Sequence, residues 1–221
     1  MGTLSLFRIY ILKDHQLEFL EEQIVKGCKR FDRSAQRDLY ELYRSRLNVL
    51  VKRYIIDSDD AKDVLQESFL LIFKNITQFK NEGSLEGWIK RIVINTSLQF
   101  LKKQKKNRDN ISINEYDIED NDNGTFEENY SIDKCDEASL SNGIDLVKQA
   151  NIQEKELLEI IQSLGVDFRQ VFNLFYIDNY NHSEIAKMLG IEEGTSRTRL
   201  ARAKKKVQAE LYKRCVEKVT V

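Results

Sequence analysis

Basic side chains at helical spacing are the most chemically informative feature near the C-terminus. On the helix expected over residues 193–213, one face carries small and apolar side chains: Ser196, Leu200, Ala203, Val207 and Leu211. The opposite side and its flank are polar and basic: Arg197, Thr198, Arg199, Arg202, Lys205 and Lys206. Arginine can read guanine edges in a DNA major groove, and other basic groups can neutralise phosphates. The spacing therefore predicts a DNA-contacting helix, with a solvated basic helix as the alternative.

The segment before this helix favours the DNA-contacting interpretation. Asn181 can cap a short helix, and Glu184 stands three residues later as in a capping box. Ala186 is small where two helices would cross, and Gly190 can take the left-handed conformation that ends a helix. We interpret His182 as a polar residue of the first turn rather than a ligand. This arrangement predicts a helix-turn-helix whose second helix enters the major groove.

The helix expected over residues 58–79 has two different faces. Its apolar stripe suits a protein core and comprises Ala61, Leu65, Phe69, Ile72, Phe73 and Ile76. The opposite stripe is acidic and polar and ends in a leucine: Asp63, Gln66, Glu67 and Leu70. Such a stripe could dock a basic or amphipathic helix of a partner, and the alternative is a solvated surface.

A polar loop and the basic helix after it form a third candidate site. The loop Phe79-Lys80-Asn81-Glu82-Gly83-Ser84 contains an aromatic residue and a glycine. The helix over 85–105 should bury Trp88, Ile89, Ile92, Val93, Thr96 and Phe100, and should leave another side open: Arg91, Asn95, Leu98 and Lys102. Basic residues beside such a loop could grip a single strand while a pocket takes an unstacked base. The alternative is that Phe79 and Trp88 are core residues.

Most of the remaining sequence shows helical periodicity, so these candidate sites should lie on a helical scaffold. We predict an all-α fold with helices near residues 14–26, 34–56, 58–79, 85–105, 152–163, 167–177, 182–189 and 193–213. Residues 107–149 are rich in Asp, Glu, Asn and Ser and have few apolar side chains. Such a segment cannot bury enough surface to offset the entropy of ordering, which predicts a flexible acidic linker between two small helical domains.

The net charge of −1 conceals an uneven charge distribution along the 221 residues. Residues 1–106 carry 20 Lys and Arg against 14 Asp and Glu, and residues 160–221 carry 11 against 7. Residues 107–159 between them carry 4 against 15. Two basic blocks therefore flank an acidic one, which is compatible with a nucleic-acid partner despite the average.

The sequence offers little for catalysis or for metal binding. It has only two histidines, no glycine loop that could cradle a phosphate, and no carboxylate cluster on an expected helix. Asp120-Asn121-Asp122-Asn123-Gly124 resembles a calcium loop, but Tyr130 stands where the bidentate glutamate would be required. We therefore expect no enzyme activity, metal, cofactor or small-molecule substrate.

Cysteine usage and hydropathy indicate a cytoplasmic protein. Cys28, Cys135 and Cys215 are isolated, with no paired spacing and no nearby histidines, so reduced thiols are expected rather than a zinc site. No apolar run is long enough for membrane insertion. The apolar stretch Leu4–Leu12 carries Arg8 and has no small-residue cleavage site after it, so we do not expect a signal peptide.

Three stretches taken together resemble the sigma-70 family of RNA polymerase sigma factors, in its extracytoplasmic-function (ECF) group. Residues 60–69 (DAKDVLQESF) resemble the polymerase-docking region, and residues 83–96 (GSLEGWIKRIVINT) resemble the promoter-melting region. Residues 180–186 (YNHSEIA) followed by 194–203 (GTSRTRLARA) resemble the family's C-terminal helix-turn-helix. The likeness covers residues 23–213 and keeps the regions in order.

The resemblance implies a division of the chain. Residues 23–106 would form the sigma region 2 domain and residues 152–213 the region 4 domain, with the acidic linker at 107–151 between them. Residues 1–22 would be an N-terminal extension of uncertain role, and residues 214–221 a C-terminal tail. The linker would run toward the RNA exit path of the polymerase.

The resemblance also implies roles for individual residues. The docking surface on core RNA polymerase would comprise Asp63, Gln66, Glu67 and Leu70. The surface for the −10 promoter element would comprise Phe79, Lys80, Ser84, Trp88, Arg91, Asn95 and Lys102, with a flipped base in the loop. The surface for the −35 element would comprise Arg197, Thr198, Arg199, Ala201, Arg202 and Lys205. Members of this group are commonly restrained by an anti-sigma factor, which we expect as a further partner.

Some residues depart from the family pattern. These departures leave the predicted fold unchanged and bear on which promoters the protein would recognise. Leu164-Gly165 replaces a common Leu-Pro, Gln99 stands where aspartate is common, and Glu192 replaces a usual serine cap. The competing interpretation is a helix-turn-helix regulator that acts without polymerase docking. It would need a dimerisation surface or a sensor domain, and the sequence indicates neither.

Overall fold

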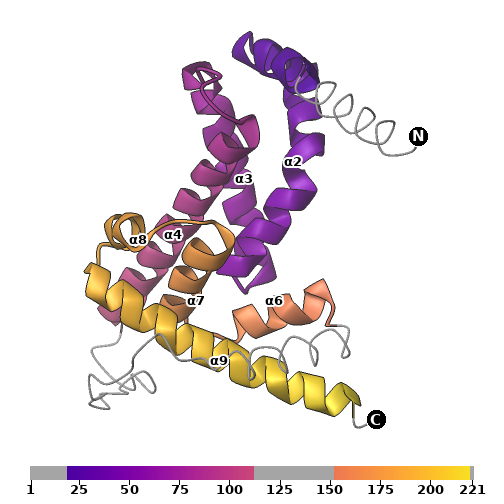
Figure 1. The fold of residues 1–221 in the computed structure, drawn as a ribbon. Helices are drawn as coiled ribbons and strands as arrows, with labels where there is room; N and C mark the ends of the chain where they lie inside the picture. The colour runs from indigo at the N-terminus through magenta and orange to yellow at the C-terminus, as the bar shows by residue number, and fades with distance from the viewer. Residues whose placement is uncertain (1–18, 112–151, 220–221) are drawn as a thin grey trace. The chain divides into compact units, whose positions relative to one another are not determined.

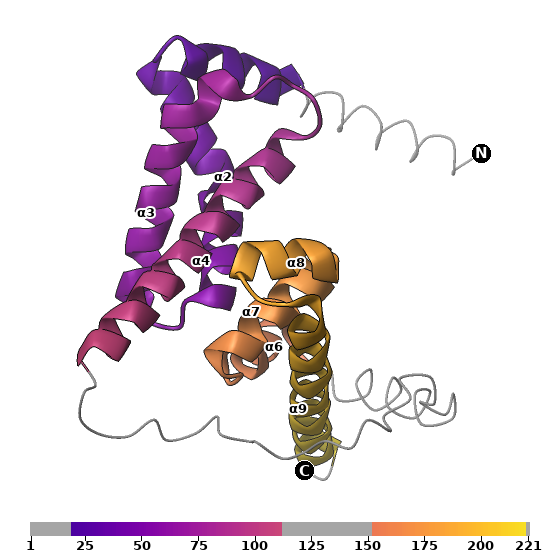
Figure 2. The same cartoon turned by 90° about the vertical axis from the view of Figure 1, so that its left-hand side faces the viewer.

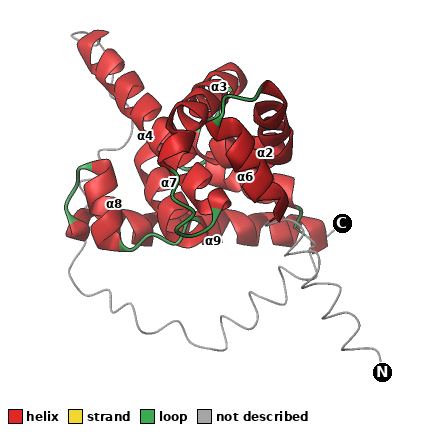
Figure 3. Ribbon diagram, turned by 90° about the horizontal axis from the view of Figure 1, so that it is seen from above, coloured by secondary structure: helices red, strands yellow, loops and turns green. Residues whose placement is uncertain are grey.

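The structure is a computed structural model that describes residues 19–111 and 152–219. The chain divides into two compact units between Phe100 and Leu101. The described residues are helices joined by loops, without a strand, as Figure 3 shows in red and green. The predicted all-α fold is confirmed for these residues. Residues 107–111, which we predicted as the start of the linker, are instead the last residues of a helix. The rest of the predicted linker, the calcium-like motif and Cys135 lie outside the described residues.

The first unit is a bundle of helices whose starts are set by local capping (Figures 1 and 2). A first helix is described over residues 19–29, followed by α2 (Arg33–Tyr54), α3 (Ser58–Asn75), the 3₁₀ turn η1 (Ile76–Gln78) and α4 (Leu85–Ile111), whose residues after Phe100 lie beyond the boundary of this unit. Asp32 caps α2 by accepting a 2.8 Å hydrogen bond from the backbone N–H of Ser34. Asp57 caps α3 by accepting from the N–H groups of Asp59 and Asp60, both at 2.9 Å.

The core of the first unit lies where α2, α3 and α4 meet. Its largest fully buried side chains recur at helical spacing on α2 and continue on α3, η1 and α4: Leu39, Tyr43, Leu47, Val51, Tyr54, Ile72, Ile76, Ile89 and Ile94. Tyr43 also donates a 2.5 Å hydrogen bond to the Glu21 carboxylate, which connects the first helix to α2. Burial and this contact raise the pKa of Tyr43 well above its ordinary value, so the phenol remains a donor.

The second unit comprises α6 (Glu154–Gln162), α7 (Val166–Phe172), α8 (His182–Leu189) and α9 (Glu193–Val219). A π-helical turn, η2 (Asn173–Ile177), continues directly from α7. The core joins α6 and α7 to one face of α9 and comprises Ile160, Leu164, Phe168, Ala203 and Val207, with Phe172 and Leu211 packed against it. This core fixes the face of α9 that is turned away from solvent.

Two differences from the sequence prediction have a common physical origin in packing. Helix α9 was expected to end at residue 213 but continues to Val219, because Cys215 is buried and Arg214 and Lys218 pair with Glu159 and Glu156 of α6. Residues 214–219 are therefore a packed helix end rather than a tail.

The second difference concerns α4, which buries a wider face than we predicted. Leu98 was expected on the open side with Arg91 and Asn95, but it is only 7% exposed. Ile94 and Leu101 are also buried, and these three side chains form a second apolar row at helical spacing. The helix therefore buries two rows of apolar side chains rather than one. No helix in the described parts of the chain is long and apolar enough to cross a membrane.

Candidate nucleic-acid interface

The helix-turn-helix of the second unit has the capping geometry that the sequence predicts. The Asn181 side chain accepts a 3.0 Å hydrogen bond from the N–H of Glu184, whose carboxylate accepts one of 2.9 Å from the N–H of Asn181. Gly190 has a φ of 68° and ends α8 in the left-handed conformation. Since an L side chain is strained there, glycine allows the tight turn into α9.

A polar contact that the sequence analysis missed fixes α8 against α9. His182 Nδ1 lies 2.9 Å from Ser196 Oγ, and the imidazole stacks on Phe175 with ring centroids 4.8 Å apart. Burial and the charge of Arg197 lower the pKa of His182, which favours the neutral ring. The sequence contained one indication of this contact, because Ser196 is a polar residue on the otherwise apolar face of α9.

The two faces of α9 are arranged as predicted. Ser196, Leu200, Ala203 and Val207 are buried, and Leu211 is half-buried. Side chains from the predicted DNA-contacting set point outward: Arg197, Thr198, Ala201 and Lys205 are exposed, and Arg202 is half-buried. Helix α9 thus presents a basic surface. Figure 1 shows the α9 ribbon in yellow beside α7 and α8 in orange.

Arg199 differs from the other members of the predicted −35 set. Its guanidinium donates a 2.8 Å hydrogen bond to the Asp167 carboxylate at the start of α7, and its side chain is only 25% exposed. Arg197 instead pairs at 3.0 Å with Glu193, one turn earlier on the same helix and open to solvent. Arg199 therefore holds α9 to α7, whereas Arg197 remains on the outer surface.

The acidic stripe on α3 is exposed along its length. Asp63, Gln66, Glu67 and Leu70 all face solvent, and Leu70 is 69% exposed. The other side of α3 is buried and comprises Ala61, Val64, Ser68, Phe69 and Ile72. An exposed leucine beside two carboxylates is a surface that can bury apolar area against a partner.

The loop between η1 and α4 has one buried end and one open end. Phe79 is only 6% exposed and packs on Trp88, with ring centroids 5.5 Å apart. This burial favours core packing for Phe79, while Trp88 is half-buried. Lys80 and Ser84 are exposed, and Ser84 Oγ accepts a 3.0 Å hydrogen bond from the N–H of Gly87.

The outer face of α4 carries the other residues of the predicted −10 surface. Arg91, Asn95 and Lys102 are exposed at helical spacing, so they form one polar row that leads away from the loop. The predicted −10 residues thus divide into a buried aromatic support and an exposed polar row.

Among the described residues, no group of His, Cys, Asp and Glu could hold a metal ion.

Comparisons with known proteins match both units. A family model described as Sigma-70 region 2 matches residues 39–107, and one described as Sigma-70, region 4 matches residues 154–207. The ECF RNA polymerase sigma-E factor of Haemophilus influenzae is 25% identical over 194 residues, covering 88% of this chain and 96% of the relative. That of Escherichia coli K12 is 24% identical over 190 residues, covering 86% and 93%.

A solved structure, the sigma factor RpoE in complex with the anti-sigma factor NepR from Bartonella quintana, is similar at a TM-score of 0.46 and 16% identity. It covers 80% of this chain and 96% of its own. The two family models together span more than half of the chain, in the family's order, so the chain belongs to the sigma-70 family. Within that family it is an ECF sigma factor. Sigma factors are transcription initiation factors that direct RNA polymerase to promoters, and they are not enzymes.

Proposed function

We propose that this protein binds core RNA polymerase in the cytoplasm and brings it to promoters by recognising a −10 and a −35 element. The single observation that best supports the proposal is the outer face of α9, which is basic and held in place by α7 and α8. The capped turn at Gly190 places that helix as the second element of a helix-turn-helix.

We assign recognition of the −35 element to the exposed side of α9. Arg197, Thr198, Ala201, Arg202 and Lys205 would face the major groove, where arginine reads guanine and lysine neutralises phosphate. Arg199 was predicted to share this role, but its ion pair with Asp167 suits positioning of the helix. Its effect on promoter use would then be indirect.

We assign the −10 element to the loop and the polar row of α4. Lys80 and Ser84 would contact the strand at the loop, and Arg91, Asn95 and Lys102 would follow its backbone along the helix. Phe79 and Trp88 would shape the loop from below through their ring contact. This arrangement gives the aromatic pair a supporting role and leaves phosphate contacts to the exposed side chains.

We assign polymerase docking to the exposed stripe of α3, comprising Asp63, Gln66, Glu67 and Leu70. Leu70 provides apolar area, and the carboxylates provide charge complementarity to a basic surface. In this scheme, residues 23–106 dock and open DNA, residues 107–151 link the two domains, and the domain that begins at residue 152 reads the −35 element. An anti-sigma factor that masks these faces would restrain the protein.

In-vitro transcription tests the proposal directly. Core polymerase with the purified chain should yield discrete transcripts from genomic fragments, and core polymerase alone should not. The chain should also bind core polymerase in the absence of DNA. If it binds DNA but not core polymerase, the protein is a helix-turn-helix regulator instead, and the sigma function is refuted.

A further inference from the structure

The turn between the first helix and α2 presents an exposed aromatic side chain on a strained backbone. Phe31 is 72% exposed, more than any other large apolar side chain that the structure describes. Its φ of 61° lies in the left-handed region, where a phenylalanine is strained. Neither burial nor local geometry accounts for an aromatic residue here, which suggests that its role lies in a contact outside the chain.

Local contacts hold this turn in one conformation. The N–H of Phe31 donates to the carbonyl of Cys28 at 3.0 Å, and the N–H of Asp32 donates to that of Gly27 at 3.1 Å. A Cβ at Gly27 would collide with the Cβ of Ala35, so glycine permits the end of the first helix to cross α2 closely. The Phe31 ring is therefore presented from a fixed corner rather than from a loose loop.

Three arginines surround Phe31 in the sequence and face solvent. Arg30 precedes it, and Arg33 and Arg37 stand one turn apart on the exposed side of α2. Within the described part of the chain, no carboxylate forms an ion pair with any of the three. The Asp32 carboxylate instead caps α2, and hydrogen bonds from Ser34 lower its pKa. This corner therefore carries a net positive charge beside an exposed ring.

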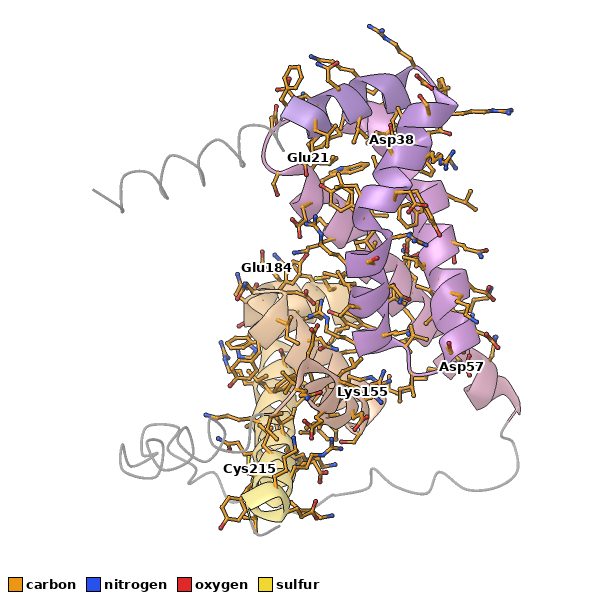
Figure 4. The ribbon with its side chains drawn as sticks, turned by 90° about the vertical axis from the view of Figure 1, so that its right-hand side faces the viewer. Glu21, Asp38, Asp57, Lys155, Glu184 and Cys215 are labelled. Atoms are coloured by element: carbon orange, nitrogen blue, oxygen red, sulfur yellow. The ribbon has the colours of Figure 1, made fainter. Side chains whose placement is uncertain are left out.

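The corner is joined directly to the loop that we assign to the −10 element. Lys29 Nζ donates a 2.6 Å hydrogen bond to the carbonyl oxygen of Phe79, where that loop begins. Figure 2 shows the first helix and the loop before α4 at the same end of the unit, and in Figure 4 the labels of Glu21 and Asp38 mark that end. A strand held by the loop would need only a short extension to reach the corner.

We propose that Arg30, Phe31, Arg33 and Arg37 form a second single-strand-binding surface, which takes up promoter DNA next to the segment held by the loop. Base stacking on an exposed aromatic ring tolerates any sequence, and arginines hold the backbone phosphates. The inference rests on the proposed function, because single-stranded DNA is supplied only by promoter opening. The basic charge and the continuity with the loop favour DNA over a protein partner.

Photocrosslinking tests the proposal in the complete initiation complex. The photoreactive amino acid p-benzoylphenylalanine would replace Phe31 in the full chain, and holoenzyme would be irradiated on a promoter fragment found by in-vitro transcription. We expect a crosslink to one DNA strand beside the −10 element, only at temperatures at which the promoter is open. The matched control places the same group at Ile56, which is also exposed but lies just after the other end of α2. It should not crosslink DNA.

The outcomes separate this inference from the sigma function. If wild-type protein directs transcription but position 31 crosslinks a polymerase subunit, or nothing, the inference is overturned and the function stands. If no promoter-directed transcript forms at all, both fail. Phe31→Ala should shorten the open-complex lifetime about fivefold or more, since each stacked base contributes at least that factor. Phe31→Trp should retain the wild-type lifetime.

Removing charge gives a second and independent readout. Open-complex stability falls with salt, and we measure the slope of its logarithm against the logarithm of the salt concentration. Arg33→Ala with Arg37→Ala should make this slope shallower by about 0.7 for each phosphate that is no longer neutralised. Lys155→Ala with Lys213→Ala removes the same charge from exposed sites in the second unit and should leave the slope unchanged. Equal slopes for both double variants would contradict the assignment of the arginines.

Discussion

Phe31 illustrates how one residue can combine a cost in stability with a role in binding. A non-glycine residue at a φ of 61° is strained, and its exposed ring gains no burial in the free protein. Phe31→Gly should therefore stabilise the first unit by about 1 kcal/mol, although it removes the ring that we assign to DNA. Urea unfolding followed through the fluorescence of Trp88, the only tryptophan, reports on this unit.

The control for this prediction is Phe31→Ala, which removes the ring but keeps a Cβ and hence the strain. It should leave the free energy of unfolding close to that of the wild type. If alanine stabilised the unit as much as glycine, the exposed ring rather than the backbone would be the cause.

Two arginines three positions apart on α9 should respond differently to substitution. Arg199→Ala breaks the pair with Asp167 and should lower the free energy of unfolding of the second unit by about 1 kcal/mol, near the upper value for a partly exposed pair. Asp167→Ala should have a similar effect, and the double variant should cost less than the sum of the two. Circular dichroism during urea unfolding measures each variant.

Arg202→Ala provides the contrast, because Arg202 belongs to the surface assigned to the −35 element and its loss should weaken promoter use directly. If Arg199→Ala left stability unchanged but reduced promoter use as strongly as Arg202→Ala, both arginines would read DNA. The assignment of Arg199 to positioning would then be wrong.

At the scale of elements, the C-terminal end of α9 should be required for stability. Ending the chain after Lys213 removes the buried Cys215 and the ion pairs of Arg214 and Lys218 with α6. The second unit should become less stable by about 2 kcal/mol, because burial and pairing are both removed. Thermal unfolding by circular dichroism should show a lower transition for this unit. The Trp88 fluorescence transition of the first unit should not move.

Tyr212→Ala is the control for the truncation, since Tyr212 lies on α9 but is exposed. It should change stability little. An equally stable truncated chain would mean that residues 214–219 contribute nothing to the unit and behave as the tail that the sequence suggested.

The ends of a helix could be predicted from the sequence where capping residues set them. They could not be predicted where packing against a distant part of the chain sets them. Helix α8 has the expected bounds because Asn181 and Gly190 set both ends by themselves. The end of α9 depends on contacts with α6, which lies more than 50 residues earlier in the chain. The second buried row of α4, with Leu98, likewise required knowledge of what packs there.

The same distinction holds within the candidate site. Helical periodicity alone predicted the buried and exposed faces of α9 and the exposed stripe of α3. Contacts between residues far apart in sequence were missed: Arg199 with Asp167, His182 with Ser196, and Lys29 with Phe79. None of them has a fixed spacing that a linear pattern could reveal.

At the scale of the whole molecule, the charge distribution matches the proposed division of work. The two basic blocks, residues 1–106 and 160–221, contain the surfaces that we assign to DNA. The carboxylates Asp63 and Glu67 lie apart from these surfaces, on the face of α3 that we assign to polymerase. Because phosphate contacts release counterions, promoter binding should weaken steeply with salt. A near-neutral protein can thus bind DNA strongly when its charges are segregated.

That division of work can be tested by separating the two interactions. Asp63→Ala with Glu67→Ala should weaken binding of the chain to core polymerase about tenfold or more, because paired charges at an interface are removed. Arg202→Ala should leave that affinity unchanged and reduce promoter transcription about 5- to 100-fold, as expected for one base-reading contact. Anisotropy of the labelled chain with core polymerase measures the first effect, and in-vitro transcription at holoenzyme concentrations that do not saturate the promoter measures the second. Glu22→Ala with Glu41→Ala removes the same charge from exposed sites on other helices and should change neither. If both the α3 and the α9 variants weakened core binding equally, docking would not be confined to α3, and the two units would not have separate roles.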